Sequence, residues 1–157
     1  MRKRVAAGAY HKEDTMRVVI GSDAAGMPLK ELIKNTLVAD GHDVVDLSIE
    51  PAADFVDSAT AVAHDLMEHP ESLGFAFDAY GVGSYMAATR VKGMVAANIS
   101  DERSSYMTRE HNNSRMICMG PEVVGEELAC RIAREFLKAG YAGGRHQVRV
   151  DMLNKMA

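Results

Sequence analysis

Hydrophobic residues in this chain gather in short runs that are separated by longer stretches of mixed polarity. Each run is rich in Val, Ile, Phe, Leu, Ala or Met and is flanked by polar or turn-forming residues, which is typical of buried β-strands. The expected strands are Arg17–Gly21, Val44–Leu47, Leu73–Phe77, Met94–Ile99 and Arg115–Met119.

Most of the stretches between these runs place apolar side chains three and four residues apart, which indicates amphipathic helices, whereas Asp101–Asn112 is predicted as a polar helix from its cap. In the first of them, Leu29, Ile33 and Leu37 share a face, Pro28 suits the first turn and Gly41 can close the end. The expected helices are Pro28–Ala39, a segment capped by Asp57 or Ser58 and ended by Pro70, Gly83–Arg90, Asp101–Asn112 capped by Ser100 or Asp101, Pro121–Lys138, and about 146–156.

This alternation of strands and helices predicts βαβ units with right-handed crossovers, and therefore a parallel sheet. We expect an α/β fold: one domain, a three-layer sandwich around a five-stranded Rossmann-like sheet. Ligands of such sheets bind at the carboxyl ends of the strands. Two polar loops with glycines, 22–26 and 78–84, follow strands at that edge.

The composition of the chain argues against nucleic-acid binding and against a membrane-spanning segment. The chain has 157 residues, 47% hydrophobic and 25% charged, with a formal net charge of −4, so no basic face recommends nucleic acid. No apolar run approaches the roughly 20 residues that cross a bilayer. Cys118 and Cys130 form no Cys-x-x-Cys pair and lie in apolar segments, so we expect free thiols and a cytoplasmic location.

The first residues stand apart from this pattern. They are polar and aperiodic, and Met16 directly precedes the first strand. We therefore expect residues 1–15 to be a disordered extension, an added sequence or the product of an upstream start codon, and the domain to span 16–157.

The turn from Asp78 to Ser84 contains Gly81 and Gly83 between a strand and a helix. Unpaired N–H groups and the helix dipole at such a turn favour an anion. A tight turn that simply requires two glycines explains the same letters. The loop 21–26 lacks the middle glycine of a dinucleotide fingerprint, and neither a Walker A motif nor a metal-ligand spacing occurs, so we expect no cofactor and no metal.

Two further segments carry candidate chemistry. His111 lies among polar residues just before a strand, where a histidine near its ordinary pKa can act as acid or base. Arg145 and Arg149 are four residues apart and so share one face of a predicted helix. Another face of this helix carries the apolar residues Val148, Met152 and Met156, through which the helix can dock. Paired guanidinium groups suit a phosphate. A solvated basic stripe is the alternative for these arginines.

Together these residues resemble the family of type-B ribose-5-phosphate isomerases and galactose-6-phosphate isomerases. The likeness runs from Met16 to Met156 and rests on IGSDAAG, the strand–GVG–helix turn, SDERSSYMTREHNN, the MG after the fifth strand, and GGRHQVRV. The chain resembles the galactose-6-phosphate isomerase branch of this family more closely, on the segments DFVDSATAVA and GGRHQVRVDMLNKM. The enzymes of that branch combine two types of chain, an A-type and a B-type.

The departures from the family pattern concern one half of the site. Members that are active alone typically have Asp-His in the first loop, where this chain has Asp23-Ala24, and Cys-Gly-Thr-Gly-Val-Gly in the second. The family's cysteine base and its threonine correspond here to Asp78 and Tyr80. The resemblance therefore implies a degenerate half-site, in which Asp23, Asp78, Tyr80, Gly81 and Gly83 only shape a pocket.

The other half of the site matches the family. The resemblance implies that His111 and Asn112 cross to a neighbouring subunit's pocket, where the histidine assists ring opening, and that Arg145, Arg149 and Arg109 bind the substrate phosphate. A family arginine is Val95 here, which implies a reduced or reshaped phosphate site.

The implied activity is the interconversion of D-galactose 6-phosphate and D-tagatose 6-phosphate through an enediol in lactose and galactose catabolism. It requires a hetero-oligomer with the B-type chain of galactose-6-phosphate isomerase, which the C-terminal helix reaches. Two alternatives remain: an isomerase that works alone with Asp78 as its base, and a non-catalytic phosphosugar-binding or scaffold protein.

Overall fold

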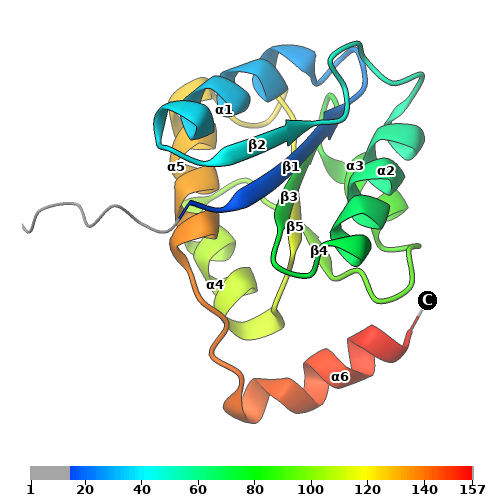
Figure 1. The fold of residues 1–157 in the computed structure, drawn as a ribbon, viewed down its shortest axis with the longest axis vertical. Coiled ribbons are helices and arrows are strands. Elements are labelled where there is room, and N and C mark those ends of the chain that lie inside the picture. Colours follow the sequence, from blue (N-terminus) through cyan, green and yellow to red (C-terminus); the bar gives the residue numbers. More distant parts are fainter. Residues whose placement is uncertain (1–14, 157) are drawn as a thin grey trace, which may run out of the picture.

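The computed structural model describes residues 15–156, so nearly all of the expected N-terminal extension lies outside the described residues. Strands and helices alternate along the chain as predicted (Figure 1). In chain order they are β1 (Arg17–Ser22), α1 (Met27–Ala39), β2 (Asp43–Asp46), α2 (Phe55–Glu68), β3 (Leu73–Phe77), α3 (Val82–Ala88), β4 (Ala96–Asn98), α4 (Glu102–Asn112), β5 (Met116–Met119), α5 (Glu126–Lys138), the 3₁₀ turn η1 (Gly144–His146) and α6 (Gln147–Lys155).

The five strands form one sheet in the order β2-β1-β3-β5-β4, and every neighbouring pair is parallel. The predicted α/β fold is therefore confirmed. The direction in which the sheet grows reverses between β1 and β3, and such a switch point is where open α/β sheets bind ligands. The strands β2 and β4 are the two edges.

Helices cover both faces of the sheet (Figure 1). The helices α1 and α5 pack on one face around Ile33, Phe75 and Phe136, and α2 and α3 pack on the other around Val62 and Met116. The helix α4 joins the first layer, where the buried Ser105 hydroxyl donates to the carbonyl of Ile132, 2.8 Å away. This makes the predicted three-layer sandwich.

Two helix starts differ from the prediction by more than one residue. The cap of α2 is Asp54, not Asp57 or Ser58, because the Asp54 carboxylate accepts the N–H of Asp57 at 2.9 Å. The helix α5 begins at Glu126 rather than Pro121. The chain first turns back after β5, where the N–H of Glu122 donates to the carbonyl of Ala79.

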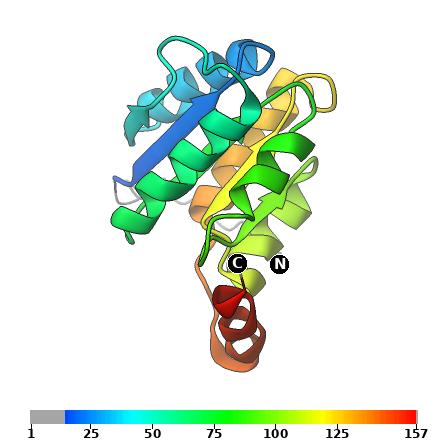
Figure 2. The same ribbon diagram turned by 90° about the vertical axis from the view of Figure 1, so that its right-hand side faces the viewer.

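The last helix, α6, lies beyond the amino ends of the strands and projects from the body of the domain (Figures 1 and 2). The predicted docking face of α6 is wrong in part, since Val148, Met152 and Met156 are mostly exposed and Val150 is the buried residue, with 2% of its surface exposed. A contact of α6 with a partner chain stays a prediction.

Candidate active site

The fold separates the predicted site residues into two groups, one at the carboxyl ends of the strands and one at their amino ends. Asp23 follows the carboxyl end of β1, and Asp78 follows the carboxyl end of β3. His111 instead closes α4, which has run back to the amino end of β5. We call these the carboxyl-edge group (Asp23, Asp78, Tyr80, Gly81, Gly83) and the amino-edge group (Arg109, His111, Asn112, Arg145, Arg149).

The two loops of the carboxyl-edge group lie side by side at the switch point. Ser22 and Phe77 are paired across β1 and β3, and the buried Ser22 hydroxyl is 3.1 Å from the carbonyl of Phe77. The Asp23 carboxylate accepts the N–H of Gly26 at 3.1 Å and so holds the first loop closed on itself. Hydrogen bonds within this chain therefore hold the first loop in place.

Asp78 occupies the centre of the glycine turn. Its side chain is buried, and its Oδ1 accepts the N–H groups of Tyr80 and Gly81 while Oδ2 accepts that of Ser84 at 2.9 Å. These are the donors that the glycine pattern would offer to an external anion. The carboxylate of the chain itself takes them, so the turn is satisfied without a ligand.

The two glycines are required by this geometry. Gly81 has a φ of +82°, which favours glycine, and a Cβ on it would meet Asn98 and the backbone of Met119 within 3 Å. A Cβ on Gly83 would lie 2.9 Å from both the Asp78 carboxylate and the Phe55 ring. Tyr80, at the tip, is 60% exposed.

Neither cysteine of the chain belongs to the glycine turn. Both thiols are free, as predicted, but Cys118 is buried in β5 and Cys130 is half-buried in α5. Burial raises the pKa of the Cys118 thiol above its ordinary range, and the charge of Asp78 raises it further. A neutral thiol in the core cannot take a proton from a substrate.

The amino-edge group has a further histidine beside it, His146, to which the sequence pattern gave no role. The rings of His111 and His146 stack at a centroid distance of 4.2 Å and an interplanar angle of 15°. The N–H of Ala142 donates to the carbonyl of Glu110 at 3.0 Å and fixes the segment before η1 against the end of α4. In the sequence, only the position of His146 within GGRHQVRV could have indicated this contact.

Arg145 and Arg149 lie near His146, close enough for their charges to act on its ring. Gly143 and Gly144 both have positive φ angles and turn the chain into η1 and α6. Both guanidinium groups are exposed, and within residues 15–156 neither has a hydrogen-bond or ion-pair partner. Desolvation lowers the pKa of His146, and the positive charges of His111, Arg145 and Arg149 lower it further.

Arg109 and Asn112 are held by their own chain. The Nη1 of Arg109 donates to Asn113 Oδ1 at 2.6 Å and to the carbonyl of Ser114, and burial lowers the pKa of this arginine. Phosphate binding by Arg109 stays a prediction. The hydroxyl of Thr108 donates to Asn112 Oδ1 at 3.2 Å, which leaves the Asn112 amide N–H₂ for another acceptor.

Residues 15–156 contain neither a membrane-spanning helix nor a metal cluster. None of the helices in this range is long and apolar enough to cross a membrane. Among the same residues, His, Cys, Asp and Glu side chains form no group of three or more that could hold a metal ion.

The sequence profile of one protein family, Ribose/Galactose Isomerase, matches residues 18–153. The chain belongs to the ribose/galactose isomerase family. Within this family it is 57% identical to the galactose-6-phosphate isomerase subunit LacA of Streptococcus mutans, over 90% of this chain and 99% of that protein. It is 54% identical to the corresponding LacA protein of Enterococcus faecalis, over 90% of this chain and 100% of that protein.

Solved structures of the ribose/galactose isomerase family share the fold. Ribose-5-phosphate isomerase B of Clostridium thermocellum has a TM-score of 0.85 and 33% identity, covering 88% of this chain and 95% of its own. Ribose-5-phosphate isomerase B of Mycoplasma genitalium, determined with bound ribulose-5-phosphate, has a TM-score of 0.84 and 34% identity, covering 88% and 94%.

Proposed function

We propose that this chain is the LacA component of a heteromeric, cytoplasmic galactose-6-phosphate isomerase, which interconverts D-galactose 6-phosphate and D-tagatose 6-phosphate in lactose and galactose catabolism. The names of the LacA relatives and the family membership support the substrate class. The chain supplies the amino-edge group to a site whose base and glycine turn belong to the second, B-type chain of the enzyme, here called the B-type partner.

The observation that carries this proposal is that both carboxylate oxygens of Asp78 already accept hydrogen bonds from the backbone. An isomerase base needs an oxygen that can reach the proton on C2, but both Asp78 oxygens accept backbone N–H groups inside a buried turn. At the amino ends of the strands, Arg145 and Arg149 are exposed near the His111–His146 pair, and neither has a side-chain partner among the described residues. The chain thus has a closed turn and an open ring-opening and phosphate-binding group.

In the proposed reaction, His111 moves a proton between the ring oxygen and O1 so that the sugar opens to the aldehyde. A cysteine of the B-type partner then takes the proton from C2, and the electrons of that bond form the enediolate between C1 and C2. The same proton is delivered to C1 while the hydroxyl proton of O2 passes to O1, so that O2 becomes the carbonyl, O1 becomes a hydroxyl, and the ketose is released. The N–H groups of the partner's glycine turn stabilise the enediolate charge.

Arg145 and Arg149 hold the phosphate at C6, which positions C1 and C2 at the base. Asn112 donates its free amide N–H₂ to a sugar hydroxyl. Binding energy from the distant phosphate is thereby used to orient the reacting carbons.

The proposal is tested by purifying this chain and the B-type partner separately, and by assaying tagatose 6-phosphate formation by each protein and by their mixture. We expect activity in the mixture and almost none in this chain by itself. In the mixture, His111→Ala should lower kcat by about 10²-fold or more, the usual size of an acid–base contribution. Substantial activity from the isolated chain would overturn the proposal.

A second variant separates the proposal from an isomerase that uses Asp78 as its base. Asp78→Asn should leave kcat of the folded mixture within about threefold, since the group only closes its own turn, whereas loss of a general base costs about 10²–10⁴-fold. An unchanged rate in His111→Ala would instead favour a scaffold role for this chain.

A further inference from the structure

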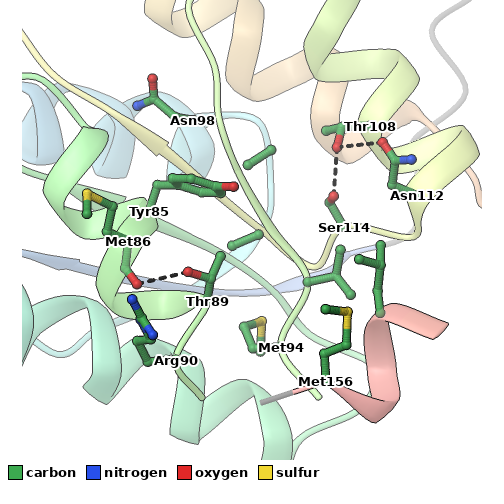
Figure 3. A pocket seen from close by; sticks show the side chains of 14 residues that line it. Tyr85, Met86, Thr89, Arg90, Met94, Asn98, Thr108, Asn112, Ser114 and Met156 are labelled. Carbon is green, nitrogen blue, oxygen red and sulfur yellow. Dashed lines mark hydrogen bonds between the residues drawn. The ribbon is translucent and has the colours of Figure 1, made fainter. Parts of the chain in front are cut away.

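The imidazole of His111 makes no hydrogen bond to the part of the chain that the structure describes. The Glu110 carboxylate is close, but its Oε2 is 3.8 Å from Nε2 of His111, which is beyond hydrogen-bond distance. The His111 side chain is also 40% exposed. Asn112, the next residue, is held differently, because its Oδ1 accepts the hydroxyl of Thr108 at 3.2 Å (Figure 3). A contact other than a hydrogen bond must therefore orient the His111 ring.

The contact that covers His111 is the ring of His146. The centroids of the two imidazole rings are 4.2 Å apart and their planes differ by 15°, so the rings are stacked. A stacked ring cannot turn freely about χ2, since rotation would drive its edge into the neighbouring ring. Stacking occupies a face of the ring only. Both nitrogens of His111 lie at the ring edge and stay available to donate or accept a proton.

The backbone around His146 is itself fixed. The N–H of Ala142 donates to the carbonyl of Glu110 at 3.0 Å, which ties the segment before η1 to the end of α4. The N–H of His146 donates to the carbonyl of Gly143 at 3.0 Å and closes η1. One turn further along α6, Val150 is buried, with 2% of its surface exposed. The stack therefore rests on a backbone that is held on both sides of the ring.

The charges around His146 keep its ring neutral near pH 7. Desolvation lowers the pKa of His146 below the ordinary histidine value, and the positive charges of His111, Arg145 and Arg149 lower it further, against the opposing charge of Glu110. A neutral ring can stay stacked on His111 while His111 carries a proton, whereas two charged imidazoles would repel each other. The pair can therefore hold a proton on His111 without separating.

We infer that His146 is a positioning residue for ring opening, which fixes the plane of the His111 ring by stacking and leaves its nitrogens free of hydrogen bonds to the protein. The inference rests on the proposed function, because it takes His111 as the acid–base group. In ring opening, a nitrogen of His111 gives its proton to the ring oxygen as the bond from that oxygen to C1 breaks, and takes the proton of O1 as the aldehyde forms. The stack directs this nitrogen without occupying it.

The first test compares two variants of His146 in the mixture of this chain with the B-type partner. His146→Ala removes the stack, so kcat for tagatose 6-phosphate formation should fall about 10- to 100-fold, because a misplaced catalytic group loses rate on this scale. KM should change by less than about threefold, since the phosphate-binding arginines remain. His146→Phe keeps a flat ring at the same place and should restore kcat to within about threefold of the wild type. His64→Ala, at an exposed histidine of α2, is the matched control and should leave kcat unchanged.

Wild-type kcat in His146→Ala would overturn the inference. An equal loss in His146→Phe would overturn it as well, because a nitrogen of His146 would then act by itself. A raised KM with unchanged kcat would assign His146 to substrate binding and not to the positioning of His111.

The stack itself is tested without activity, by a proton NMR titration of the histidine rings in the isolated chain. His111→Phe keeps a ring beside His146 but removes its charge, so the pKa of His146 should rise. An unchanged or lower pKa of His146 would show that the two rings are not in contact, and would overturn the inference. The proposed function fails separately, if the wild-type mixture forms no tagatose 6-phosphate while the titration still shows the two rings in contact.

Discussion

Asp78 illustrates how one substitution changes the use of a loop. Its carboxylate accepts three backbone N–H groups, while Asp23 in the neighbouring loop accepts one. A charged acceptor shared by several amides at the start of a helix is a strong local interaction. The residue therefore holds the glycine turn in its closed shape.

This predicts a large stability effect. Asp78→Ala leaves buried N–H donors without partners, so the free energy of unfolding should fall by about 3 kcal/mol. Asp23→Ala removes one half-buried acceptor and should cost about 1 kcal/mol. Urea denaturation at neutral pH, followed by circular dichroism, measures both. Equal losses in the two variants would contradict the role given to Asp78.

At this scale the sequence identified the candidate residues but not what they touch. The letters at positions 78 and 80 suggested a degenerate turn, yet the hydrogen bonds of Asp78 go to backbone groups, which leave no mark in the sequence. The stack of His146 on His111 joins segments that are 35 positions apart by their residue numbers. Contacts of this kind depend on where α6 emerges, and no local pattern specifies that.

At the scale of elements, the pattern of apolar, polar and capping residues predicted the five strands and six α-helices of the described chain, and the errors lie at element ends and in the unpredicted 3₁₀ turn η1. The strand β4 is shorter than Met94–Ile99, and α2 and α5 begin elsewhere than expected. Helix starts depend on single hydrogen bonds, and several nearby Asp and Ser residues could have made them. The structure selects Asp54 because its extended backbone directs the carboxylate to the N–H of Asp57.

The cap of α2 can be tested directly. Asp54→Ala removes the acceptor of the Asp57 N–H and should lower the free energy of unfolding by about 1 kcal/mol. Asp57→Ala, the cap expected from sequence, should cost only about 0.3–0.5 kcal/mol through the helix dipole. Thermal unfolding of the two variants side by side distinguishes them, and a larger effect at Asp57 would restore the original assignment.

At the scale of the whole molecule, the parallel fold was predictable, but the strand order was not. The order β2-β1-β3-β5-β4 sets the loops after β1 and β3 next to each other and leaves β4 as a free edge. It also places the two groups of the site at opposite ends of the strands, because Asp23 and Asp78 follow the carboxyl ends of β1 and β3 while His111 precedes the amino end of β5. An alternation of strands and helices is compatible with many strand orders, so this arrangement required the three-dimensional structure.

The closed turn has a consequence for the assembled enzyme. In the proposed assembly of this chain with its B-type partner, the partner's glycine turn would complete the site at His111, while the Asp78 turn would belong to the second site of the pair. The carboxylate of Asp78 repels a negatively charged enediolate and holds the N–H groups that would stabilise it. Each pair should therefore contain a single competent site.

Isothermal titration of the mixture with galactonate 6-phosphate measures this. Its carboxylate resembles the enediolate and cannot isomerise, so it should bind tightly with a stoichiometry of one per pair of chains. Arg149→Gln in this chain should weaken that binding about tenfold, as expected for a lost charge-assisted phosphate contact. Two equal tight sites per pair would contradict this prediction. The Asp78 carboxylate should repel the carboxylate of the inhibitor, so a site at the Asp78 turn cannot bind it as tightly as the other site does.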